Sequence, residues 1–167
     1  MPRSVDFCVK SPASVEQIHS AFSDENYWQT RLAEFGGFGT LDSLVIDSDR
    51  AATVVIIQKL RHEGLPKIVA RFFPRDWKVV QKETWRPIGD GLVRGEIDIA
   101  SHGAPGSGSG VALLAPTESG SRLDCNATVE FRVPLVGGKI ESMIGHMLSQ
   151  QFNIIERFTT KWITEQA

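Results

Sequence analysis

The 167-residue sequence has no excess of charge of one sign and no long apolar run. It holds 18 basic and 20 acidic residues, a formal net charge of −2. Proteins that follow a nucleic-acid backbone carry a basic surface, so this balance argues against nucleic acid as a partner. No apolar run approaches the roughly 20 residues that span a bilayer, and the first residues lack the apolar region of a secretory signal. We therefore expect a soluble, cytoplasmic protein with at most transient membrane contact.

Motifs of familiar chemistry are also missing. The only two cysteines, Cys8 and Cys125, lie far apart without CxxC spacing, so we expect free thiols. The four histidines do not show metal-ligand spacing, and no serine stands in a GxSxG motif. The segment "GSGSG" (106–110) lacks the lysine of a phosphate-binding loop and is predicted to be a hinge or lid loop. No metal and no cofactor are expected.

The hydrophobic periodicity, in contrast, is clear along most of the chain. Alternation with period 2 predicts strands, and apolar residues spaced three and four apart predict helices. The predicted order is a strand at 4–10, two short helices within 12–35, a hairpin at 38–62 turning near 47–50, a short amphipathic helix between Pro66 and Pro74, strands at 76–87, 91–101, 109–117 and 122–135, and a long helix from 138 to about 165. Strands grouped together and helices segregated from them favour an α+β fold. An apolar fraction of 41% suffices for one core, so we expect a single domain over 1–167.

This order is similar to that of the START-like superfamily, also called the helix-grip, birch-pollen-allergen-like or SRPBCC fold. The strings "VVQKETWRP", "GSGSGVALLAPTESGSRLDCNATVEF" and "VPLVGGKIE" resemble an uncharacterised actinobacterial family, domain of unknown function 2505. The resemblance implies a curved antiparallel sheet of about six to seven strands that wraps a long C-terminal helix around a cavity. It implies no catalytic residue. The superfamily includes lipid and sterol carriers, hormone receptors, and polyketide aromatases and cyclases, so the fold alone does not choose a function.

Alternation on two strands indicates which polar side chains face such a cavity. Lys59 marks the outer face of one strand, and Lys78, Lys82 and Arg86 mark that of another, which leaves four residues inward: Gln58, Gln81, Glu83 and Trp85. On the long helix, the polar Gln151 interrupts an apolar stripe that includes Met147 and Ile155, with His146 at its edge. Alternatively, the glutamines are ordinary structural amides, and Glu83 pairs with a basic residue or lies at the rim of the sheet.

Three functions follow from this pattern. The first is binding of a hydrophobic small molecule, either a lipid, a sterol-like or a polyketide-like compound, through Gln58, Gln81, Glu83, Trp85, Met147, Gln151 and Ile155. The second is an aromatase, cyclase or hydrolase in which Glu83 acts as general acid or base, because burial can raise the pKa of a carboxyl group. The third is an interaction module whose core is filled. The short helix between Pro66 and Pro74 is either a gate or a cover for the core. The ligand's identity and the oligomeric state stay open.

Overall fold

The computed structural model describes residues 2–35, 39–61, 67–72, 75–103, 105–133 and 135–167. Within them the α+β order expected from the sequence is confirmed. The strands are β1 Arg3–Ser11, β2 Gly39–Ile46, β3 Ala52–Arg61, β4 Asp76–Gly89, β5 Leu92–His102, β6 Gly106–Thr117 and β7 Gly120–Phe131, and the helices are α1 Val15–Phe22, α2 Glu25–Glu34, α3 Lys67–Ala70 and α4 Gly137–Gln166.

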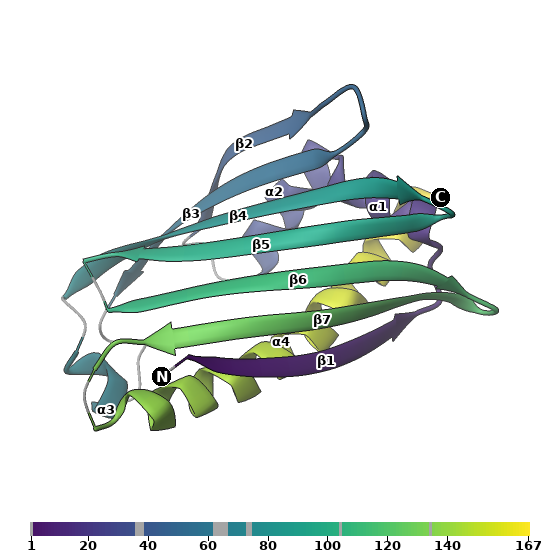
Figure 1. Ribbon diagram of the computed structural model, residues 1–167. Coiled ribbons are helices and arrows are strands. Elements are labelled where there is room, and N and C mark those ends of the chain that lie inside the picture. Colours follow the sequence, from purple (N-terminus) through teal and green to yellow (C-terminus); the bar gives the residue numbers. More distant parts are fainter. Residues whose placement is uncertain (1, 36–38, 62–66, 73–74, 104, 134) are drawn as a thin grey trace.

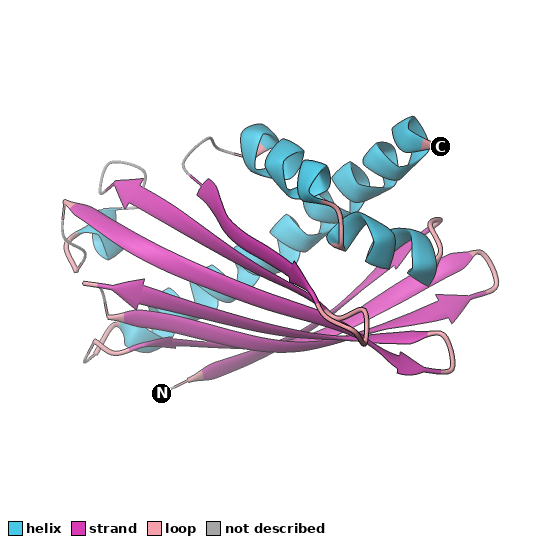
Figure 2. Ribbon diagram, turned by 90° about the horizontal axis from the view of Figure 1, so that it is seen from above, coloured by secondary structure: helices cyan, strands magenta, loops and turns pink. Residues whose placement is uncertain are grey.

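All seven strands belong to one antiparallel sheet in the order β1-β7-β6-β5-β4-β3-β2. The sheet is curved, and α1, α2 and α4 lie on the same side of it (Figure 2). Helix α4 runs diagonally across the sheet, beginning near α3 and ending beside α1 and α2 (Figure 1). A curved sheet around one long helix is the predicted helix-grip architecture.

Two hydrophobic clusters hold the helices against the sheet. The larger contains the fully buried Tyr27 and Trp28 of α2, together with Phe22 and Trp85, whose ring centroids lie 4.8 Å apart. The smaller cluster contains Phe131 and Ile140. Phe72 packs against it, with 6.1 Å between the ring centroids of Phe72 and Phe131. The segment that includes α3 therefore covers the second cluster, and its role as a gate remains a prediction.

The glycine-rich segment 106–110 is not a loop, and this prediction was wrong. It forms the first part of β6, paired with β5 and β7 on its two sides. Gly110 pairs with Ile97 and Ala127, so hydrogen-bonded neighbours fix a stretch that its composition suggested was flexible. Because Gly110 lacks a side chain, the inner face of the sheet is left uncovered at this point.

The junction between β7 and α4 contains two glycines, Gly137 and Gly138, but neither has a positive φ. Leu135 has a φ of 70° and is completely exposed, so the reversal takes place at Leu135. Gly137 begins the helix, where a Cβ atom would lie 2.5 Å from the Phe131 carbonyl oxygen. Close approach to the strand therefore requires this glycine. One turn later, the buried Glu141 accepts a hydrogen bond from the Phe131 amide at 2.8 Å, which ties α4 to the end of β7.

Candidate functional site: a cavity under the C-terminal helix

A cavity of about 370 Å³ lies between the inner face of the sheet, the pair α1–α2, and α4. Most of its wall consists of apolar side chains. The described residues that line it are Val9, Ser11, Ile18, Phe22, Arg31, Leu32, Phe35, Gly39, Ile56, Gln58, Gln81, Glu83, Trp85, Ile97, Ser109, Gly110, Leu114, Ser121, Leu123, Cys125, Ala127, Leu148, Gln151, Phe152, Ile155, Glu156 and Thr159. A cavity of this size argues against the third hypothesis, an interaction module whose core is filled.

Glu83 is the buried carboxylate of this wall. It is 4% exposed and lies on β4 between Gln81 and Trp85, all three lining the cavity. Its Oε1 accepts a hydrogen bond from Trp85 Nε1 at 3.0 Å, and its Oε2 accepts one from Gln81 Nε2. None of the ion pairs found within the described part of the chain includes Glu83. The carboxylate is therefore held by two neutral donors of its own strand, and neither the cationic partner nor the rim position of the alternative reading is found.

The structure places six of the seven predicted residues in the cavity wall. Gln58, Gln81, Glu83 and Trp85 come from β3 and β4, and Gln151 and Ile155 come from α4, where Gln151 is solvent-exposed. The placement of Met147 was wrong, because its side chain is 56% exposed and Leu148 lines the cavity instead. Successive helix residues differ by about 100°, so an error of one position changes the face.

His146 lies differently from what the sequence suggested, and His19 is buried beside the cavity wall. His146 is exposed and its Nε2 lies 3.3 Å from Gln150 Nε2, so it does not reach the described cavity wall. His19 is 9% exposed, and its Nε2 donates to the Trp85 carbonyl oxygen at 3.3 Å. It therefore supports the backbone of β4 next to Glu83.

A chain of hydrogen bonds on the helical side of the cavity was missed by the sequence reasoning. Arg31 donates to Tyr27 Oη at 3.5 Å, and Tyr27 Oη lies 2.7 Å from Thr159 Oγ1. Thr159 donates to the Ile155 carbonyl at 2.8 Å, so Tyr27 is the donor to Thr159. Burial raises the pKa of the Tyr27 phenol, which the positive charge of Arg31 partly opposes. A buried phenol at this point keeps its proton and links α2 to α4.

The free thiol of Cys125 also lines the cavity, whereas Cys8 is exposed. Burial raises the pKa of Cys125 to about 11, and the negative charges of Glu83 and Asp6 act in the same direction. The thiolate is the reactive form of cysteine, so Cys125 is an inert, weakly polar part of the wall at neutral pH.

Within the described residues, no group of three or more histidine, cysteine, aspartate or glutamate side chains is arranged to hold a metal ion. The described helices also include none with the length and apolar character that a bilayer crossing requires. Among the described lining residues, the polar groups are amides, hydroxyls, one thiol, the Trp85 indole N–H and the charged groups Arg31, Glu83 and Glu156.

The curved sheet, the long helix α4 and the cavity between them together define a helix-grip fold. A START superfamily protein from Mycobacterium smegmatis is similar, with a TM-score of 0.55 at 12% identity over 98% of this chain and 99% of that chain. Norcoclaurine synthase from Thalictrum flavum, in complex with dopamine and hydroxybenzaldehyde, has a TM-score of 0.53 at 14% identity over 100% of this chain and 89% of that chain. At these identities the likeness establishes the fold alone.

The sequence matches one family directly. Residues 6–163 match the family described as "Protein of unknown function (DUF2505)". An uncharacterised protein of Mycobacterium tuberculosis is 38% identical over 171 residues, which cover 98% of each chain. The chain therefore belongs to the DUF2505 family, as its resemblance implied.

Proposed function

We propose that the protein binds a hydrophobic small molecule, a lipid, sterol-like or polyketide-like compound, in the cavity under α4. The observation that carries the proposal is a partly open cavity of about 370 Å³ with a mostly apolar wall. Ligand pockets typically measure about 300–1,000 Å³, and this one lies near the lower limit. A compact ligand with a single chain or a few rings fits such a space better than a lipid with two chains.

The polar groups of the wall support this proposal because they could orient a bound ligand, and they do not form a recognisable catalytic arrangement. Gln58 and Gln81 provide amides on the sheet side, and Gln151 provides one on the exposed side of α4. A few polar groups in an apolar pocket are the usual means of fixing a ligand's orientation. The complex of norcoclaurine synthase with dopamine and hydroxybenzaldehyde supports the view that this fold can enclose small aromatic molecules.

Native mass spectrometry of gently purified protein, followed by titration with a fluorescent fatty acid, tests the proposal. We expect a retained apolar ligand, or saturable binding at one site per chain. Gly110→Val should weaken binding at least tenfold, because its side chain would enter the cavity from the inner face of β6. The matched control is Gly108→Val, on the same strand and face, since Gly108 is not among the described residues of the wall. Absence of binding, or an equal effect of both variants, would contradict the proposal.

An enzymatic alternative is supported by one observation, the buried carboxylate of Glu83 in the cavity wall. A carboxyl group in such surroundings can serve as general acid or base in an aromatase, a cyclase or a hydrolase. For a hydrolase, p-nitrophenyl esters with two to eight acyl carbons are suitable probes. Glu83→Gln should abolish turnover and leave fatty-acid binding intact. Equal rates for wild type and variant would exclude this role of Glu83.

The single domain over 1–167 and the cytoplasmic location remain predictions. One cooperative thermal transition is expected if the chain folds as one domain, because small single domains usually unfold in an all-or-none manner. Two separate transitions would contradict that expectation.

A further inference from the structure

Arg31 is the one cationic group among the described residues of the cavity wall, and neighbouring side chains hold it in place. It lies on α2 and is half-buried, with its guanidinium 4.7 Å from the centre of the Trp28 ring. Trp28 is itself fixed, because it is fully buried and its Nε1 donates to the Phe22 carbonyl at 2.8 Å. A guanidinium stacked on an immobile ring loses little freedom when it binds a further partner.

The charge of Arg31 has no carboxylate partner in the described part of the chain. None of the six ion pairs found there includes it, and its one hydrogen bond goes to Tyr27 Oη. A guanidinium has five N–H donors, so most of them stay open. Glu83 and Glu156 also line the cavity, but each already accepts hydrogen bonds, and Thr160 Oγ1 donates to Glu156 at 2.6 Å.

We infer that the ligand is an apolar monocarboxylic acid whose carboxylate pairs with Arg31 while its body occupies the apolar cavity. This inference rests on the proposed function and specifies its ligand class. Guanidinium and carboxylate form paired, charge-assisted hydrogen bonds, and such bonds are strongest where water is excluded. A second carboxylate would be disfavoured, because the remaining charges of the wall, Glu83 on β4 and Glu156 on α4, are both negative.

Calorimetric titration with dodecanoic acid and with its methyl ester separates the two parts of this inference. The two probes share the same chain and differ in the anionic group. Wild-type protein at pH 7.5 and low salt should bind the acid about tenfold more tightly than the ester, the usual contribution of one such charged hydrogen bond. Arg31→Met should remove this preference by weakening acid binding alone, whereas Arg31→Lys should retain part of it.

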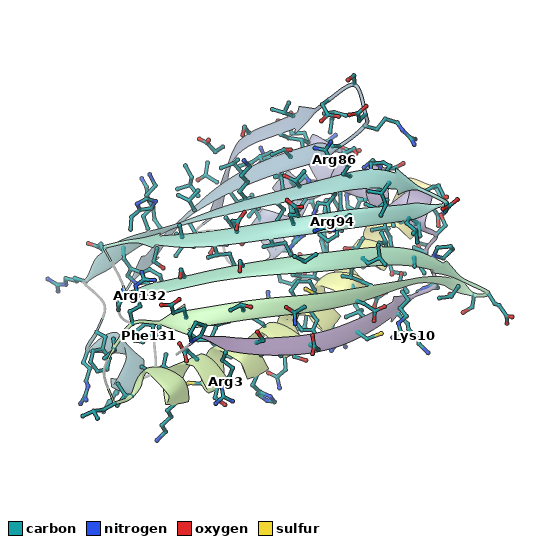
Figure 3. All side chains as sticks on the ribbon, viewed as in Figure 1. Arg3, Lys10, Arg86, Arg94, Phe131 and Arg132 are labelled. Atoms are coloured by element: carbon teal, nitrogen blue, oxygen red, sulfur yellow. The ribbon has the colours of Figure 1, made fainter. Side chains whose placement is uncertain are left out.

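Arg94→Met is the matched control, because Arg94 lies on the outer face of the sheet (Figure 3) and pairs with Glu96 at 3.4 Å. It should leave the preference unchanged. Equal affinity of wild type for acid and ester, or a preference that survives in Arg31→Met, would overturn the inference and leave the proposed function in place. Failure of both probes to bind, together with the absence of any retained ligand in native mass spectrometry, would overturn the proposed function as well. If Arg31→Met does not fold, the wild-type comparison and Arg31→Lys decide the question.

Discussion

Substitution of Gly95 tests whether the wall of the cavity is packed as described. Gly95 pairs with Trp85 across β4 and β5, and a Cβ atom on Gly95 would lie 2.4 Å from the ring carbon Cζ3 of Trp85. The ring is confined, since Trp85 is 2% exposed, packs on Phe22 at 4.8 Å and donates to Glu83 at 3.0 Å. Gly95→Ala must therefore displace this ring or separate the strands.

The expected loss of stability is large for one methyl group. Overpacking a core costs about 1–3 kcal/mol, and loss of the hydrogen bond from Trp85 to the Glu83 carboxylate would add about 1.5–3 kcal/mol. The entropic gain from replacing glycine is smaller, about 0.4–1 kcal/mol. A net loss of about 3 kcal/mol lowers the Tm of a chain of this length by roughly 6–12 °C.

Thermal unfolding followed by circular dichroism measures this change. Gly110→Ala is the control, because the atom nearest to its added Cβ is 3.5 Å away, an ordinary contact. Its Tm should stay unchanged or rise by a degree or two. A Tm for Gly95→Ala within about 1 °C of wild type would refute the described packing of Trp85, since the expected net loss of about 3 kcal/mol already includes the entropic gain and corresponds to roughly 6–12 °C.

Three further predictions follow from buried ionisable groups. Tyr27 is the only tyrosine, so absorbance at alkaline pH reports it alone; its pKa should exceed 10.0 in the folded protein and return to about 10 in urea. Because the folded pKa is the higher one, its contribution to stability is complete below pH 10 and is lost as the pH rises above it. With a thiol-specific disulfide reagent at pH 8, Cys8 should react at once and Cys125, whose pKa is about 11, only after unfolding; two fast thiols in the native protein would contradict this. Glu141→Ala should lower the free energy of unfolding by about 2 kcal/mol in a urea titration, whereas Glu141→Gln, which keeps an acceptor for the Phe131 amide, should cost less; equal losses would contradict the role of this bond.

The strand side of the cavity could be predicted from the sequence, and the helical side only in part. Lysines on β3 and β4 mark the outer face of the sheet. Because side chains alternate with a period of two, Gln58, Gln81 and Glu83 must then lie on the inner face. On α4 the apolar stripe is broad, so Met147 and Leu148 are both acceptable members until the helix is packed against the sheet.

Long-range contacts account for what the sequence did not reveal. In the sequence, Arg31 of α2 looks like an ordinary solvent-exposed residue. In the fold, its contacts with Tyr27 and Trp28 hold it beside the cavity. The buried partner of Tyr27, Thr159, is 132 residues away. Segment 106–110 resembles a loop because its composition says nothing of the two strands that pair with it.

The cost of the cavity leads to a last prediction. A sealed, dry void costs about 24 cal/mol per Å³, so about 370 Å³ would cost at most on the order of 9 kcal/mol, since this cavity is partly open to solvent. That is comparable to the whole stability of a typical domain, about 5–15 kcal/mol. Solvent that enters the partly open cavity reduces the penalty, yet replacing it with an apolar ligand should still be favourable.

Dodecanoic acid at 100 times its Kd should therefore stabilise the protein by about 2.7 kcal/mol, which raises the Tm by roughly 5–11 °C. In Gly110→Val, side-chain carbon fills part of the same space permanently. This variant should unfold at a higher Tm without ligand and should show little further rise with it, whereas Gly108→Val should respond to the acid as wild type does. A lower Tm for ligand-free Gly110→Val would mean that the space has no room for a side chain, and hence none for a ligand.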